Sequence, residues 1–179
     1  ITWGADGAQY TGAGDNNNRD RTGALVESPL SFFKISGTPD TLNCTHPETH
    51  HNQPSPQCSN ISLRGANIVV THDDPNHCPV WHNGIPNVKS SGVLSLGGTL
   101  YWAVSCFNYG DDKVFNRQRY GPAWILTSTD GGATWNKTAT PPDMFEGRLA
   151  APRFVQYGRD NAGAPDDYVY VYFPSTLDG

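Results

Sequence analysis

The chain has 179 residues, with 12 Lys plus Arg against 17 Asp plus Glu, which gives a net charge of −5 with neutral histidines. A nucleic-acid-binding domain is expected to show a basic patch or stripe, so this balance argues against a nucleic-acid partner. Charged residues make up only 16% of the sequence, below the ~25% of ordinary globular domains, which disfavours long charged helices. No run reaches the ~18 consecutive apolar residues of a membrane span, and no membrane partner is expected.

Residues 1–35 alternate short apolar runs with turns of Gly, Asn and Asp. Strands are expected at 1–4, 8–12 and 30–35, because each run ends in a turn signal within roughly ten residues. The next stretch is rich in proline and polar residues and lacks a periodic apolar pattern, apart from a strand expected at 66–71. We therefore expect one domain over residues 1–179, in which 38–86 form a loop-rich, disulfide-stapled insertion.

The second half of the chain contains the clearest hairpin signal. The apolar runs at 91–96 and 99–105 are joined by Gly97-Gly98, and paired glycines suit a primed turn, which requires positive φ at both central residues. Further strands are expected at 124–127, 154–157 and 168–172, and a short helical turn only within 141–149. The fold class predicted by this pattern is all-β.

Cysteines and glycosylation sequons indicate the compartment. An even set of four cysteines and three Asn-x-Ser/Thr sequons favour a secreted, extracellular protein with two disulfides and N-linked glycans. The residues concerned are Cys44, Cys58, Cys78 and Cys106, with Asn43, Asn60 and Asn136.

Two questions about the cysteines stay open in the sequence. Pairing Cys44 with Cys58 would close a loop of about 14 residues and leave Cys78 to pair with Cys106, although the sequence alone allows three pairings. A zinc site is the rival interpretation, because six histidines lie among these cysteines, even though the spacing fits no zinc finger or ribbon. These are His46, His50, His51, His72, His77 and His82.

Residues 128–135 resemble the Asp-box, Ser-x-Asp-x-Gly-x-x-Trp, which recurs in the β-propeller blades of sialidases and related sugar-active proteins. In such a turn the Ser and Asp side chains bond backbone N–H groups and Gly131 and Gly132 permit positive φ, while Trp135 folds back onto the sheet. The resemblance implies a propeller. It gives Asp130 a structural role and no catalytic one.

A second resemblance extends over most of the chain. The first motif that carries it is Trp3-Gly4-Ala5-Asp6-Gly7-Ala8-Gln9-Tyr10 followed by Gly12-Ala13-Gly14-Asp15. The others are Lys89-Ser90-Ser91-Gly92-Val93 with residues 98–101, and residues 154–160 followed by 166–170. With these motifs the chain resembles a domain-of-unknown-function family of secreted bacterial and fungal propellers. Some members of that family are endo-acting D-arabinofuranosidases. The resemblance therefore implies a glycoside hydrolase acting on an arabinan-like polysaccharide or oligosaccharide. The insertion at 38–86 departs from the family pattern, and other polysaccharides are plausible substrates.

Together these resemblances predict a β-propeller portion of about three to four blades with long cysteine-containing loops. A propeller has to close into a ring, because an open blade leaves strand edges unpaired. We therefore expect a further chain segment or a second polypeptide to continue from Ile1 and Gly179 and to complete the ring.

Glycoside hydrolysis usually needs two carboxyl groups, one as proton donor and one as nucleophile or base. Asp6 and Asp15 are the leading pair, because each occupies a Gly-flanked site in the first family motif. Glu27, which precedes Ser28-Pro29 at the entrance of a strand, is the next candidate and suits a proton donor. The alternative for Asp6 and Asp15 is that both are turn aspartates.

Substrate contacts would come from aromatic rings that stack on a sugar and from cations that bond its hydroxyls or an acidic substituent. The candidates are Tyr10, Arg19, Lys89, Trp102, Arg119 and Tyr120. The run Asp15-Asn16-Asn17-Asn18-Arg19-Asp20 offers oxygen ligands for Ca²⁺ but fails the EF-hand pattern, so no cofactor is assigned.

Three function classes are compatible with this sequence. The first is a glycoside hydrolase. The second is a polysaccharide lyase on a propeller scaffold, with His82 or Tyr120 as base and Arg119 or a metal neutralising a uronate. The third is a propeller that binds a glycan without catalysis.

Overall fold

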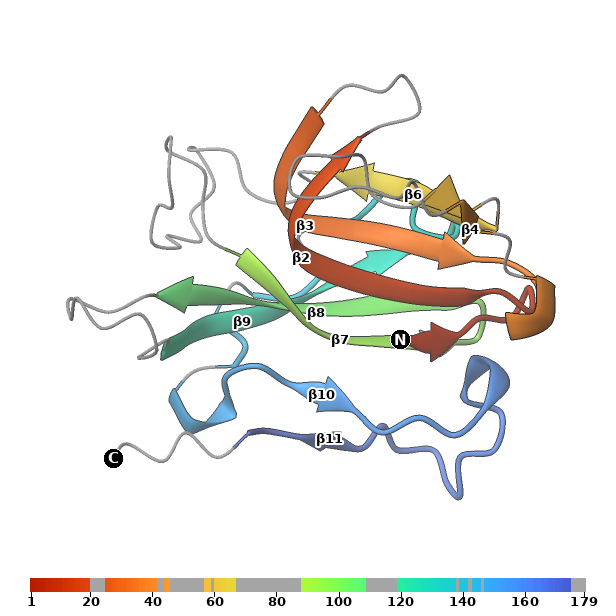
Figure 1. Ribbon diagram of the computed structural model, residues 1–179. Coiled ribbons are helices and arrows are strands. Elements are labelled where there is room, and N and C mark those ends of the chain that lie inside the picture. The colour runs from red at the N-terminus through yellow and green to blue at the C-terminus, as the bar shows by residue number, and fades with distance from the viewer. Residues whose placement is uncertain are drawn as a thin grey trace.

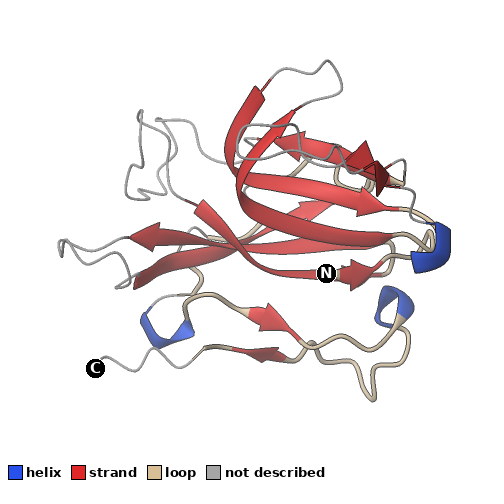
Figure 2. Cartoon of the chain, in the orientation of Figure 1, coloured by secondary structure: helices blue, strands red, loops and turns tan. Residues whose placement is uncertain are grey.

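The structure, a computed structural model, describes residues 1–19, 25–41, 44–45, 57–58, 60–66, 88–108, 119–137, 139–141, 143–145 and 147–174. Strands dominate these ranges and every strand pair is antiparallel (Figures 1 and 2). Only three short 3-10 turns interrupt them, namely η1 (Pro39–Thr41), η3 (Gly147–Leu149) and η4 (Arg159–Asn161). The all-β prediction is confirmed, and η3 lies in the segment where a helical turn was expected.

The first sheet has four strands in the order β1 (Thr2–Trp3), β2 (Gln9–Arg19), β3 (Leu25–Ile35) and β6 (Ile61–Ala66). The strands expected at 1–4, 8–12 and 30–35 overlap the first three. β2 and β3 also include residues 13–19 and 25–29, where turns were expected, so Asp15 and Glu27 lie within strands that pair with each other. β6 lies inside the segment expected to be loop-rich, where a strand was expected only from residue 66 onward. Its pairing with β3 makes it a strand of the main sheet, because Ile61 and Ser62 face Ile35 and Lys34 in register.

The second sheet is a three-stranded meander of β7 (Val88–Leu96), β8 (Thr99–Asn108) and β9 (Arg119–Ser128). Gly97 and Gly98 form the β7–β8 turn with φ of +60° and +76°, which confirms the predicted hairpin and the reason for its glycines. A further hairpin of β10 (Arg153–Phe154) and β11 (Val171–Tyr172) follows it in the chain.

The principal core fills the space between the first and second sheets. Phe32 of β3 is fully buried against Trp102 of β8 and against Trp135, with ring centroids 4.8 Å and 4.7 Å away. Alternation along β9 also directs Trp124 and Leu126 into this core. Aromatic pairs of this kind contribute about 0.5–1.5 kcal/mol each beyond the area they bury.

The opposite face of the second sheet is covered as well. Leu94 and Ala103 pack there with Phe154 of β10 and Val171 of β11. The first sheet, the second sheet and the β10–β11 hairpin therefore lie one below another in chain order (Figure 1). The middle sheet is therefore buried on both faces.

Disulfide bonding agrees with the predicted oxidised state. Cys58 and Cys106 are both disulfide-bonded, and the described part of the chain contains no free cysteine. Cys44 of β4 (Cys44–Thr45) pairs in register with Cys58 of β5 (Gln57–Cys58). Cys78 and the sequon residue Asn43 lie outside the described residues, so the two pairings stay a prediction.

Peptide mapping of the unreduced protein should recover one linked peptide that contains Cys44 and Cys58 and another that contains Cys78 and Cys106. The first pairing follows from the backbone register, because opposed strand residues bring their Cβ atoms within disulfide range. The second follows by elimination. A peptide that links Cys58 to Cys106 would contradict it.

Replacing Gly132 by Ala should destabilise the protein more than replacing Gly97. Both have positive φ, +81° and +60°, where an Ala costs about 1–2 kcal/mol. A Cβ at Gly132 would lie 2.6 Å from a Phe32 ring carbon, whereas a Cβ at Gly97 would meet nothing within 4 Å. Overpacking should add about 1–3 kcal/mol at Gly132 alone. Urea unfolding measures both losses, and equal losses would show that this turn does not pack on Phe32.

Candidate functional site

A pocket of about 230 Å³ lies between the first sheet and the Asp-box turn. Its wall combines the turn after β1, residues of β2, β3 and β6, the Asp-box turn, and three residues at the β7–β8 hairpin end of the second sheet, namely Ser95, Gly98 and Leu100. We call it the Asp6 pocket, after the residues that supply its polar groups: Asp6, Tyr10, Lys34, Arg64, Asp130 and Gly131.

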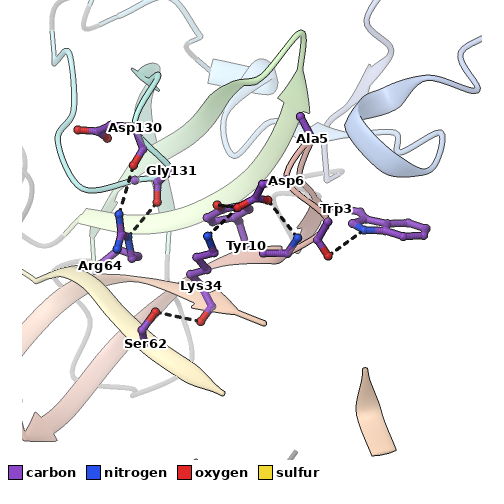
Figure 3. A network of polar contacts seen from close by, with 12 residues as sticks. Trp3, Ala5, Asp6, Tyr10, Lys34, Ser62, Arg64, Asp130 and Gly131 are labelled. Carbon is purple, nitrogen blue, oxygen red and sulfur yellow. Dashed lines mark hydrogen bonds and ion pairs between the residues drawn. The ribbon is translucent and has the colours of Figure 1, made fainter. Parts of the chain in front are cut away.

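Asp6 is the carboxylate of this pocket. Its Oδ2 accepts hydrogen bonds from Lys34 Nζ at 2.6 Å and from the Tyr10 hydroxyl at 2.8 Å, while Oδ1 accepts the Ala8 backbone N–H at 3.0 Å (Figure 3). The Ala8 bond is an Asx-turn contact, so the turn-aspartate alternative correctly describes its local geometry. The Asp6 side chain is nevertheless 43% exposed, so a ligand in the pocket can reach it.

The surroundings of Asp6 keep it ionised. Desolvation raises its pKa, but the hydrogen bonds from Lys34, Ala8 and Tyr10, together with the Lys34 charge, outweigh this and lower the pKa to about 2. The hydrogen bond to Asp6 in turn raises the pKa of Lys34. At neutral pH Asp6 can act as nucleophile, base or electrostatic partner, but it has no proton to donate.

Tyr10 contributes its hydroxyl to the pocket and not its ring face. The ring stacks on Phe32 with centroids 6.1 Å apart, and Lys34 Nζ lies 5.6 Å from the same ring. Tyr10 is only 3% exposed, which corrects its predicted role as a platform for a sugar ring. Burial, followed by the bond to Asp6, raises the Tyr10 pKa, so its hydroxyl stays protonated and donates to Asp6.

Arg64 was not predicted from the sequence. It is the extra residue of a β-bulge, because Leu63 pairs with Phe33 and Gly65 with Phe32, which leaves Arg64 without a register partner on β3. Its Nε donates to the Gly131 carbonyl at 3.1 Å and its Nη2 to the Asp130 carbonyl at 3.2 Å. Arg64 thereby links the first sheet to the Asp-box turn.

The Asp-box turn has the geometry that its sequence predicted. Asp130 Oδ1 accepts the Ser128 hydroxyl and the N–H groups of Ala133 and Thr134, and Oδ2 accepts the Thr134 hydroxyl at 2.6 Å. The bonds from Thr134, with those from Ser128 and Ala133, lower the Asp130 pKa to about 2. Its carboxylate is thus committed to the turn, and only the carbonyls of this segment serve the pocket.

The turn that carries Asp6 is clamped by the C-terminal part of the chain. Arg159 of η4 donates from Nε at 3.0 Å and also from Nη2 to the Ala5 carbonyl. The Gly7 N–H bonds the Gly4 carbonyl at 3.0 Å within the same turn. Asp6 therefore sits on a loop held at both ends, although it lies outside the strands.

The other predicted carboxylates lie on the first sheet. Glu27 of β3 pairs in register with Asn17 of β2, and Asp15 follows Tyr10 by five residues along β2, about 17 Å at ~3.4 Å per strand residue. The side chains of both lie outside the described residues, so the Asp6–Asp15 pair and the Glu27 role stay predictions. The same holds for the side chains of Arg19, Arg119 and Tyr120.

Two further binding candidates lie away from this pocket. Trp102 is completely buried and its indole N–H donates to the Ser90 hydroxyl at 2.9 Å. Trp102 is therefore a core residue, because it offers no ring face to a ligand. Lys89, partly exposed on β7, is not among the described residues that line the pocket.

Metal sites and membrane spans were searched for in the same described ranges. There, no group of three or more His, Cys, Asp or Glu side chains is arranged to hold a metal ion. The six histidines of the rival zinc interpretation lie outside these ranges, and so do the side chains of the calcium run, whose backbone up to Arg19 belongs to β2. None of the described helices is long and apolar enough to cross a membrane.

Comparisons with protein-family models, with curated proteins and with solved structures find no match to this chain.

The pH dependence of stability should reveal the Asp6 ion pair. The pKa of Asp6 is about 2 in the folded state, below the ordinary value of 3.8, so its stabilisation is present above pH 3.8 and is lost as the pH falls through about 2. Urea unfolding of the wild type and of Asp6→Asn should thus give a difference in free energy that is constant near neutral pH and shrinks in this acid range. A difference that does not change over that range would mean that the Asp6–Lys34 pair is absent in solution.

Proposed function

We propose that the protein is a secreted glycoside hydrolase that binds a polysaccharide at the Asp6 pocket. The observation that carries the proposal is a carboxylate kept ionised by Lys34 in a concave site with a tyrosine hydroxyl and an arginine. Converging polar groups in a pocket are the usual arrangement for binding a small polar unit, and a sugar ring is such a unit. The first motif, which contains Asp6, resembles a family that includes D-arabinofuranosidases. An arabinan-like polysaccharide is therefore the first substrate to test.

The chemistry assigns different roles to two carboxyl groups. Asp6, with its pKa of about 2, would be the nucleophile of a retaining reaction or the base of an inverting one. The proton donor has to be a second carboxyl group with a higher pKa. Asp15 and Glu27 belong to the same sheet as Tyr10, but Asp15 lies about 17 Å along β2 from Tyr10 and Glu27, opposite Asn17, lies farther still. Two catalytic carboxyl groups lie ~5–9.5 Å apart, so neither residue is assigned as the proton donor to Asp6.

We further propose that the three stacked sheets are part of a β-propeller. In a propeller each blade is an antiparallel sheet, and the blades are arrayed in chain order around an axis so that neighbours cover each other's faces. The burial of both faces of the middle sheet supports this arrangement. The Asp-box turn after β9 supports it independently, because the motif recurs in propeller blades.

Secretion is part of the same proposal. The disulfide-bonded state of Cys58 and Cys106 supports it, because structural disulfides persist in oxidising compartments. The sequon residue Asn136 is exposed and thus accessible to a glycosyltransferase. Asn60 donates from Nδ2 to the Thr41 carbonyl at 2.5 Å.

A second candidate function is glycan binding without catalysis. It is favoured by one observation: in the described part of the pocket, the only carboxylate besides Asp6 is Asp130, whose oxygens are already bonded within the Asp-box. If no side chain from β2 or β3 supplies a proton donor, the pocket would hold a sugar and not cleave it.

Assays on a panel of plant, fungal and bacterial polysaccharides separate these functions. Reducing ends should appear without the absorbance of unsaturated uronates, and Asp6→Asn should lower turnover by orders of magnitude because the ionised carboxylate is removed. Asp167→Asn serves as the matched control, since Asp167 is exposed and outside the pocket. Circular dichroism and thermal melting verify that both variants fold.

Full activity in folded Asp6→Asn would overturn the catalytic role of Asp6. Glycan binding with no new reducing ends would favour the binding function, and unsaturated products would favour a lyase.

A further inference from the structure

We infer that the Asp6 pocket selects a sugar unit that carries a carboxylate, a uronate, and that Arg64 is the residue that recognises it. This inference rests on the proposed function, because it names the class of glycan that the same pocket takes. It depends on how the charges in the pocket are paired and on which hydrogen-bond donors of Arg64 are already used.

The negative charge of Asp6 is already compensated. Its partner is Lys34, whose Nζ lies 2.6 Å from Oδ2 in a salt bridge. Asp130 does not compensate Arg64, because Arg64 bonds the Asp130 backbone carbonyl and the Asp130 carboxylate is held within its own turn. In the described part of the pocket, the guanidinium therefore has no carboxylate partner.

The N–H donors of Arg64 that make no hydrogen bond to the described residues form a fork. Nε and Nη2, the side edge of the guanidinium, hold the carbonyls of Gly131 and Asp130. The end edge of the group, formed by Nη1 and the second hydrogen of Nη2, has no acceptor among the described residues. Two parallel N–H groups in this arrangement match the two oxygens of a carboxylate.

The backbone fixes this fork in place. Arg64 is the extra residue of the β-bulge, and bulges re-aim a side chain relative to the regular strand pattern. Its two bonds to the carbonyls of the Asp-box turn hold the guanidinium plane at the pocket wall. A ligand thus meets a preorganised cation, and little side-chain freedom is lost when it binds.

The groups beside Arg64 are compatible with the hydroxyl groups and the negative charge of a uronate. Lys34 neutralises Asp6, so an anionic sugar does not meet an unbalanced negative charge beside Arg64. The Tyr10 hydroxyl donates to Asp6 and is also bonded to Lys34, so these two residues hold the Asp6 carboxylate in place beside the sugar. The pocket therefore combines one free cationic fork with groups for neutral hydroxyls.

Isothermal titration calorimetry with matched ligands tests this inference. The probes are tetrasaccharides of galacturonate, glucuronate and mannuronate, each with its methyl ester, in which the charge is removed and the backbone is kept. At least one acid form should bind about 10-fold or more tightly than its ester, as expected for charge-assisted hydrogen bonds. A sulfated tetrasaccharide and a neutral arabino-oligosaccharide complete the set.

Variants connect the discrimination to Arg64. Arg64→Gln should bring the acid and ester forms to equal affinity by weakening only the acid form, and Arg64→Lys should fall between, because it keeps the charge and loses the fork. Arg148→Gln is the control, since Arg148 is exposed on η3, away from the pocket. Melting curves verify folding.

The inference is overturned if no acid form binds better than its ester, if Arg64→Gln weakens both forms equally, or if the sulfated ligand binds best. These outcomes are distinct from failure of the proposed function. Cleavage of the neutral arabino-oligosaccharide that depends on Asp6 but not on Arg64 would reject the inference alone. If the acid forms bind more tightly than their esters but no glycan is cleaved, the proposed hydrolase function is rejected and the inference of uronate recognition stands.

Discussion

The contact of the Phe32 ring with Trp102 and Trp135 is the interaction on which the rest of the structure depends. It joins β3 of the first sheet to β8 of the second, and it brings in the Asp-box turn, since Trp135 is the last residue of that motif. Trp102 and Trp135 also contact each other, with centroids 5.0 Å apart. Three rings from three parts of the sequence therefore fix the distance between the sheets, and close packing of this kind leaves little room for adjustment.

The positions of the polar groups in the Asp6 pocket depend on this aromatic packing through a series of contacts. Tyr10 stacks on Phe32, and its hydroxyl then reaches Asp6. On the other side, the Asp-box turn that carries Trp135 presents the carbonyls that hold Arg64. The ionised carboxylate and the cationic fork thus stand at the edge of one aromatic core. The packing of this core therefore fixes where the Asp6 carboxylate and the Arg64 guanidinium lie. A recognition site for a small polar ligand needs polar groups that are held in place in this way.

The sequence predicted those parts of the fold that depend on local chemistry. The Gly97-Gly98 turn and the Asp-box are encoded by residues adjacent in the chain, so their spacing was sufficient. The polar and apolar alternation also identified most strands. β6 was largely missed, because Ile61–Ala66 lies in a polar segment and becomes a strand through its pairing with β3. Short-range patterns do not contain that long-range pairing.

The site was predictable only in part. Asp6 stood out through its glycine-flanked motif, but its ion pair with Lys34, 28 residues away, has no signal in the sequence. Arg64 was missed because a β-bulge, which no spacing rule reveals, places it in the pocket. Trp102 and Tyr10 were assigned as binding aromatics, whereas tertiary packing uses their rings in the core, as it does for most large apolar side chains.

A crystal structure of the protein with a bound uronate tetrasaccharide tests the central claim most directly. We expect a sugar unit in the Asp6 pocket, with its carboxylate on the end edge of Arg64 and a hydroxyl within hydrogen-bonding distance of Asp6 or Tyr10. A sugar bound elsewhere on the protein, with the Asp6 pocket empty, would contradict it.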